Sequence, residues 1–303
     1  NVVIESGGIL DADAGGSHSF GSLPINSGGT YRATDETTTI TNEASSGYAF
    51  DCDGALTANA GLFNITTTPA TSLDLICTSG NVYNLDITGG DFVQLQGTEI
   101  ITIDNDLTVS TNDFDINDKN LTVTGDVNVT GTLAAHRGTV GTQNLSFGSL
   151  TINSGGSYEA TSDTTTITSE TAGGFAVDTG ATASRITHNT GKWNIRNTTE
   201  VTSAILNTGT ATSTDGITDV TITAGSIAQW DNGLKIYDDL WIYGDFTANS
   251  DADTLTVSDR IDVYSGGTVG DGTESGLWSF DDMYINTGGT LTAGSYTYTV
   301  SEN

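Results

Sequence analysis

Basic residues are scarce in this sequence: eight Lys and Arg stand against 38 Asp and Glu, which gives the 303 residues a formal net charge of −30. A surface of this sign repels nucleic-acid phosphates and anionic lipid headgroups at long range. The sequence also lacks any window of about 18 apolar residues, roughly the length that a membrane-spanning helix needs. We therefore expect no nucleic-acid partner and no membrane insertion.

Proline and methionine are nearly absent, with two residues and one residue, and apolar residues make up only 35% of the chain. In globular chains, apolar residues usually make up about 45–50% of the sequence when glycine is counted among them. In place of apolar residues stand 38 glycines and many Thr, Ser, Asn and Asp residues. No helical hydrophobic period accompanies this composition, which favours many short strands joined by turns.

A segment of 33 residues occurs twice and then, in part, a third time. Residues 146–178 read SFGSLTINSGGSYEATSDTTTITSETAGGFAVD, and residues 19–51 are identical to them at 22 of the 33 positions. A shorter copy starts at residue 279 with SFDDMYINTGG. Internal similarity of this kind is the signature of a repeat protein. We expect repeats of roughly 130 residues at about 1–128, 129–261 and, incomplete, 262–303.

Short alternating segments such as TTTIT and LTVTGDVNV fill each repeat. Alternating Thr and Ile suit a pleated, half-buried strand, and N-[ST]-G-G suits a turn because glycine accepts a positive φ. The turn glycines are Gly28, Gly29, Gly155, Gly156, Gly288 and Gly289. The pattern predicts an all-β fold, a parallel β-solenoid that continues through residues 1–303. Tandem β-sandwiches are the alternative, because closely spaced short strands are their signature too.

The segments LTVTGDVNVTGTL, INSGGSYEAT and INTGGTLTAGSYTYTV resemble the degenerate repeats of parallel β-helices in large secreted surface proteins, adhesin stalks and phage tail fibres. The resemblance covers essentially the whole chain. It implies a right-handed parallel β-helix with a structural or attachment role.

Two cysteines, Cys52 and Cys77, lie 25 positions apart. Because one solenoid turn takes roughly 20–30 residues, this spacing places them on adjacent turns, close enough for a disulfide bond. Two small buried thiols are the alternative. A disulfide indicates an oxidising compartment, so we expect an extracellular or cell-surface protein, with a virion as the alternative location.

The sequence offers little catalytic chemistry. The adjacent carboxylates Asp238–Asp239 and Asp281–Asp282 fall where turns are expected, and none of the three histidines has a partner at catalytic or zinc spacing. We therefore expect no enzymatic activity and no catalytic residue.

Three groups of residues are candidates for binding or modification. Calcium is the one candidate cofactor, because hard cations favour clustered oxygen ligands, here Asp104, Asp106, Asp113, Asp115 and Asp118. Trp230 and Trp241 are candidates for stacking on sugar rings, although filling of the core is the alternative. Five N-x-[ST] sequons are candidate glycosylation sites, at Asn64, Asn120, Asn128, Asn144 and Asn197.

These features predict a non-enzymatic structural protein of an extracellular filament, sheath or surface coat. A solenoid exposes unpaired backbone edges at its ends, and we expect copies of this acidic chain to pair there, head to tail, into a self-assembled homopolymer. The alternative is a receptor- or glycan-binding segment of a phage tail fibre or adhesin, with surface glycans as partners.

Overall fold

The structure is a computed structural model of the chain. It describes residues 1–67, 71–89, 92–96, 100–110, 113–135, 143–179, 185–187, 189–196, 204–207, 217–231, 233–248, 253–270, 276–292, 294 and 297–300.

β-strands are the only regular elements in the described part of the chain, and the ladders between them are parallel. The strands stack as a β-solenoid of about 11 turns. This confirms the predicted all-β fold. The alternative of tandem β-sandwiches is wrong, because sandwich sheets are built from antiparallel strands. The strands of this chain pair in parallel, and a parallel neighbour is reached only after a long crossover connection.

The chain divides into two compact units, Asn1–Gln143 and Asn144–Asn303. This division falls inside the second predicted repeat. The continuity of one solenoid through all 303 residues stays a prediction.

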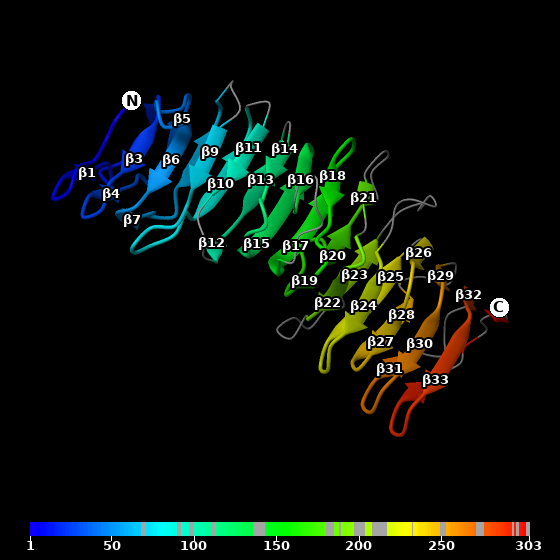
Figure 1. Cartoon of the computed structure of the whole chain (residues 1–303). Helices are drawn as coiled ribbons and strands as arrows, with labels where there is room; N and C mark the ends of the chain where they lie inside the picture. Colours follow the sequence, from blue (N-terminus) through cyan, green and yellow to red (C-terminus); the bar gives the residue numbers. More distant parts are fainter. Residues whose placement is uncertain are drawn as a thin grey trace. The chain divides into compact units, whose positions relative to one another are not determined.

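Three parallel sheets line the turns of the first unit (Figure 1). One consists of β1 (Ile9–Asp11), β4 (Thr30–Arg32) and β7 (Ala55–Thr57). The second consists of β3 (Leu23–Ile25), β6 (Tyr48–Cys52), β9 (Thr71–Asp74), β11 (Phe92–Leu95), β14 (Asp113–Asp115) and β16 (Thr132–Ala134). The third consists of β2 (His18–Phe20), β5 (Thr37–Ile40), β8 (Leu62–Ile65), β10 (Asn84–Ile87), β12 (Ile101–Ile103), β13 (Leu107–Val109) and β15 (Leu121–Val129).

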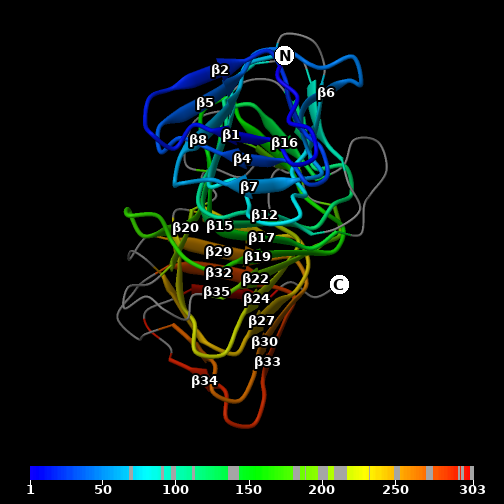
Figure 2. The same cartoon turned by 90° about the vertical axis from the view of Figure 1, so that its left-hand side faces the viewer.

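The second unit follows the same plan. One ladder joins β17 (Leu145–Ile152), β19 (Thr164–Ile167), β22 (Lys192–Ile195), β24 (Asp219–Ile222), β27 (Leu240–Ile242), β30 (Arg260–Val263) and β33 (Asp282–Ile285); the last four lie side by side in Figure 2. A second ladder runs from β17 through β20 (Phe175–Asp178), β23 (Ala204–Asn207), β25 (Ile227–Asp231), β28 (Asp245–Ala248) and β31 (Thr268–Val269) to β34 (Thr290–Leu291). The remaining pairs are β18 (Ser157–Glu159) with β21 (Arg185–Thr187), and β26 (Gly233–Ile236) with β29 (Thr254–Val257), β32 (Leu277–Phe280) and β35 (Thr297–Val300).

Alternation along each strand separates a dry interior from a polar exterior. In the third sheet of the first unit, one inward row is aliphatic throughout and almost fully buried: Ile40, Ile65, Ile87, Val109 and Val129. Each such side chain contributes about 1.5–3 kcal/mol relative to an exposed one. A slip of one residue would turn the whole row outward, so these contacts fix the register.

The N-[ST]-G-G turn is the same in all three copies. Its first glycine has a positive φ, of 82° at Gly28, 85° at Gly155 and 84° at Gly288. The amide of the second glycine donates to the carbonyl of the turn asparagine, at 2.8 Å in each copy, from Gly29 to Asn26, from Gly156 to Asn153 and from Gly289 to Asn286. A Cβ on Gly29 would lie 2.7 Å from the carbonyl oxygen of Ile4 on the neighbouring turn. The sequence repeat is therefore also a repeat of backbone conformation.

Candidate functional surfaces

The two cysteines lie on adjacent turns of the first unit and are joined by a disulfide bond, with Cα atoms 4.8 Å apart. Cys52 ends β6 and is fully buried. The bond lies just beyond the end of the ladder between β6 and β9, whose last register partners are Asp51 and Asp74. It therefore ties one turn of the solenoid to the next.

The five aspartates that the sequence suggested as calcium ligands lie in two separate places, next to strands of two different sheets. Asp104 and Asp106 follow β12, whereas the other three lie on β14 or in the turn after it. Asp104 accepts a hydrogen bond from the Asn81 amide at 2.9 Å. The buried Asp115 accepts from the Gln94 side chain at 3.1 Å. Among the described residues, no three of these carboxylates converge on a point that an ion could occupy.

A different acidic group does converge in the second unit. One carboxylate oxygen each of Asp219, Asp238 and Asp239 lies within 4.8 Å of the others. Burial is the main cause that raises the pKa of Asp219 and of Asp239. The guanidinium of Arg260 opposes the shift at Asp239, with 3.6 Å between Nη2 and the carboxylate oxygen. A cationic side chain therefore already stands beside these carboxylates.

The proposed stacking role of Trp230 is wrong, because its side chain is fully buried. Its indole packs in the core against Phe246, with centroids 4.7 Å apart, and against Trp278 at 5.4 Å. Ala228, the next inward residue of β25, is also fully buried. The alternation of apolar Ala228 and Trp230 with polar Gln229 and Asp231 was the sequence signal for an inward position.

Trp241 has the opposite orientation. It lies between Leu240 and Ile242, which are both fully buried, so its indole is on the outer side of β27. The ammonium of Lys192 lies 5.3 Å from the centre of the indole ring. The outward position was readable from the two apolar neighbours that flank it.

Three tyrosines lie on the same outer side of the sheet as Trp241. Tyr243 and Tyr264 stack in parallel, with centroids 4.4 Å apart and ring planes at 4°. Tyr284 is 52% exposed, and the guanidinium of Arg260 lies 5.8 Å from its ring centre. We call Trp241, Tyr243, Tyr264 and Tyr284 the aromatic face.

An open hollow of about 260 Å³ lies at one edge of the aromatic face, lined by Lys192, Thr221, Trp241 and Tyr243. It offers two aromatic rings, the hydroxyl groups of Thr221 and Tyr243, and the ammonium of Lys192. These groups can make stacking contacts and donate hydrogen bonds.

The sequon asparagines are placed differently from one another. Asn64, Asn120 and Asn128 are half-buried, and Asn144 is exposed. The side-chain oxygen of Asn64 accepts a hydrogen bond from the Thr88 hydroxyl at 2.6 Å. Asn197 lies outside the described residues.

The last turn of the second unit leaves part of its core uncovered. Ile242, Val263 and Ile285 occupy one inward row. The first two are 0% exposed, whereas Ile285 is 47% exposed. β33 is paired with β30 along one edge, and no described strand pairs with its other edge.

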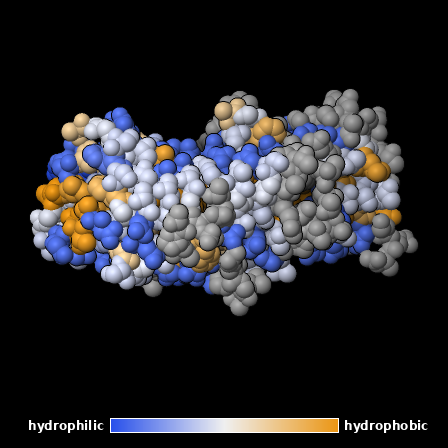
Figure 3. All heavy atoms as spheres, turned by 90° about the horizontal axis from the view of Figure 1, so that it is seen from above, coloured by the Kyte–Doolittle hydropathy of each residue, from blue (hydrophilic) through white to orange (hydrophobic). Residues whose placement is uncertain are grey.

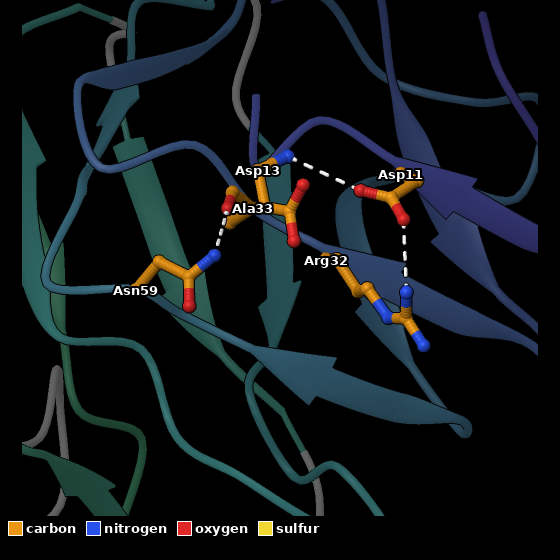
Figure 4. Close-up of polar contacts among 5 residues, drawn as sticks. All are labelled: Asp11, Asp13, Arg32, Ala33 and Asn59. Atoms are coloured by element: carbon orange, nitrogen blue, oxygen red, sulfur yellow. Dashed lines mark hydrogen bonds and ion pairs between the residues drawn. The ribbon is translucent and has the colours of Figure 1, made fainter. Parts of the chain in front are cut away.

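The first turn of the first unit also exposes apolar side chains. Val3 and Ile9 are exposed, and Figure 3 shows an apolar patch at this end of the unit. Polar contacts lie beside it: Arg32 Nη1 donates to Asp11 at 2.9 Å, and the Asp13 amide donates to the same carboxylate at 3.3 Å (Figure 4).

Among the residues that the structure describes, none belongs to a helix with the length and apolarity to cross a membrane. Comparison of the chain with protein-family models, with curated proteins and with solved structures gives no match.

Proposed function

We propose that the protein is a non-enzymatic structural component of an extracellular filament, sheath or surface coat, in which copies of the chain pair end to end. The observation that carries this proposal is the uncovered core at Ile285. A side chain of the inward row that is half exposed loses much of the stabilisation that its buried neighbours gain. A further turn of solenoid stacked on β33 would cover it.

A second copy of the chain can supply that turn. β1 is paired with β4 along one edge, and the exposed Val3 and Ile9 lie in this first turn. Residues 2–4 lie against β3 as β30 lies against β33, and β1 pairs with β4 as β31 pairs with β34. Parallel pairing of residues 2–4 of one copy with β33 of the next, and of β1 with β34, would join two different surfaces. A contact between unlike surfaces leaves the same pair of surfaces free at the ends of the product, so it continues into a filament.

Two further features support the proposal, one for the extracellular location and one for the filament. The disulfide between Cys52 and Cys77 suits an oxidising compartment. The net charge of −30 keeps the sides of such a filament apart through mutual repulsion, while the ends associate through backbone hydrogen bonds and apolar contact.

The test is the concentration dependence of assembly, measured by light scattering and electron microscopy of the intact chain. We expect filaments or end-to-end oligomers that Ile285→Asp abolishes. Leu277→Asp is the matched control, since Leu277 is similarly exposed, at 44%, but faces outward from β32. Monomers at all concentrations, or equal loss of assembly in both variants, would contradict the proposal.

A further inference from the structure

The aromatic face belongs to one ladder of the second unit. Its central outward row reads, in register order, Asn194, Thr221, Trp241, Asp262 and Tyr284. The row therefore changes from small polar side chains to large aromatic ones over successive turns. Tyr243 and Tyr264 lie beside it, directly after β27 and β30 and two residues further along the chain than Trp241 and Asp262.

These rings are not needed to fill the core. The inward row beside them is complete without them, with Ile222, Ile242 and Val263 fully buried. Solvated outward positions elsewhere in the ladder carry Thr or Asn, as at Thr166 and Asn194. Of the four rings, those of Tyr243 and Tyr284 are exposed and those of Trp241 and Tyr264 are half-buried. Aromatic rings clustered on an outer face in this way indicate a surface that has a partner.

The hollow beside Trp241 fits a small ring with hydroxyl groups. Its volume of about 260 Å³ is below the roughly 300–1,000 Å³ of pockets for drug-sized ligands. Trp241 and Tyr243 offer ring faces to the apolar side of a pyranose, and Thr221 and Lys192 offer donors to its hydroxyl groups. The ring of Tyr264 covers the other face of the Tyr243 ring, stacked in parallel with centroids 4.4 Å apart, and so holds that ring in place beside the hollow.

The charge around the aromatic face selects among sugars. Asp219 is the register partner of Lys192, and Asp262 lies between Trp241 and Tyr284 in the central row. Arg260 is already paired with Asp262, at 2.7 Å. Carboxylates accept hydrogen bonds from neutral hydroxyl groups but repel a uronic or sialic acid, and the net charge of −30 adds to this repulsion.

We propose that the aromatic face binds neutral pyranose rings of a glycan, with the hollow between Trp241 and Tyr243 as the main contact. This goes beyond the structural role proposed above and does not depend on it. Assembly is tested at Ile285, whereas glycan binding is tested at Trp241, so either proposal can fail alone.

Tryptophan fluorescence provides a readout of the site. Trp193, Trp230 and Trp278 are buried in the core, so a ligand-induced change reports mainly on Trp241. The intact chain is titrated with neutral oligomers of glucose, mannose, galactose and N-acetylglucosamine, and with uronic and sialic acid oligomers for comparison. We expect at least one neutral series to bind and to change the fluorescence, and the acidic series to bind at least tenfold more weakly.

Variants locate the binding. Trp241→Ala and, independently, Tyr243→Ala should each weaken binding at least tenfold while thermal unfolding shows a folded protein. Tyr237→Ala is the matched control, because Tyr237 has the same kind of contact with a lysine, Lys235 at 4.6 Å, beside a different sheet. The affinity of Tyr237→Ala for the oligomer should stay within twofold of that of the unchanged chain. Isothermal titration calorimetry measures the affinity of every variant.

Several results would overturn the proposal. These are the absence of binding by every neutral oligomer at millimolar concentration, unchanged affinity in both aromatic variants, or tighter binding of acidic oligomers. Loss of self-association in Trp241→Ala without any glycan binding would also overturn it and would assign the aromatic face to a second copy of the chain.

Discussion

The hydroxyl groups of Tyr158 and Thr165 lie 3.0 Å apart in a buried hydrogen bond that joins β18 to β19. Tyr31 and Thr38 make the same contact at 2.9 Å in the first unit, 127 positions earlier in the sequence. Burial raises the pKa of Tyr158, so the fold favours the neutral phenol. The repeat therefore preserves a polar contact inside an apolar interior.

Removal of one partner of this bond is expected to destabilise the protein. Tyr158→Phe leaves the Thr165 hydroxyl buried without its partner, which costs about 1–3 kcal/mol. The free energy of unfolding in urea measures the effect. The double variant Tyr158→Phe, Thr165→Val removes both polar groups and should recover part of the loss. A double variant less stable than the sum of the two single changes would contradict this explanation.

Acidification is expected to stabilise the fold. Burial is the main cause that raises the pKa of Asp51, Asp74, Asp86, Asp219 and Asp239 above 3.8. The folded state therefore binds these protons more tightly than the unfolded chain does. The resulting stabilisation is complete below pH 3.8 and is lost as the pH rises through the raised pKa values. Thermal unfolding should accordingly occur at a higher temperature at pH 4 than at pH 7.

Asp51 and Asp74 provide the control for this pH dependence, because they are register partners and burial is the main cause that raises the pKa of each. The variant Asp51→Asn, Asp74→Asn should unfold at a higher temperature at pH 7 and should show a smaller gain on acidification. An unchanged pH profile would assign the effect to the overall negative charge.

Reduction of the disulfide is expected to loosen the first unit. A loop closed by residues 25 positions apart contributes about 3 kcal/mol in the chain-entropy account. Hydrogen exchange, followed with and without reductant, should accelerate in β6 and β9 and leave β27 and β30 unchanged. Cys52→Ser, Cys77→Ser should behave like the reduced protein, and reductant should have no further effect on it.

The two tryptophans that the sequence grouped together should respond differently to truncation. Trp230→Ala removes a fully buried ring that contacts Phe246 and Trp278, so we expect a loss of about 3–5 kcal/mol. Trp241→Ala removes an outward side chain, so we expect a loss below about 1 kcal/mol. Denaturant unfolding of both variants provides the comparison, and equal losses would show that Trp241 also has a structural role.

Much of the fold was readable from the sequence, because the repeat and the alternation are local patterns. TTTI at Thr37–Ile40 and Thr164–Ile167 is a strand in both units, and the first glycine of each turn pair adopts the positive φ that the motif allows. The register between turns was not readable, because it depends on the number of residues in each intervening loop. That register decides which outward residues become neighbours.

The residues that meet in the candidate sites could not be predicted either, because the register between turns decides which residues become neighbours. The aspartates after Ile103 are close in sequence, but the solenoid places them beside strands of two different sheets. Asp219 and Asp239 are 20 positions apart, yet they meet because one turn of chain separates them. Tyr243 and Tyr264 were missed for the same reason: their stacking requires a parallel register that no single segment encodes.

The inward row of Ile242, Val263 and Ile285 also constrains how the length of this protein can change. Its members are separated by 21 and 22 residues, and each returns to the same place only after the chain has completed a full circuit. An insertion or deletion of an odd number of residues within a strand would reverse inner and outer positions in the rest of that strand. Gain or loss of an entire circuit keeps inner and outer positions in every remaining strand, so gene duplication can lengthen the molecule in steps of a whole circuit.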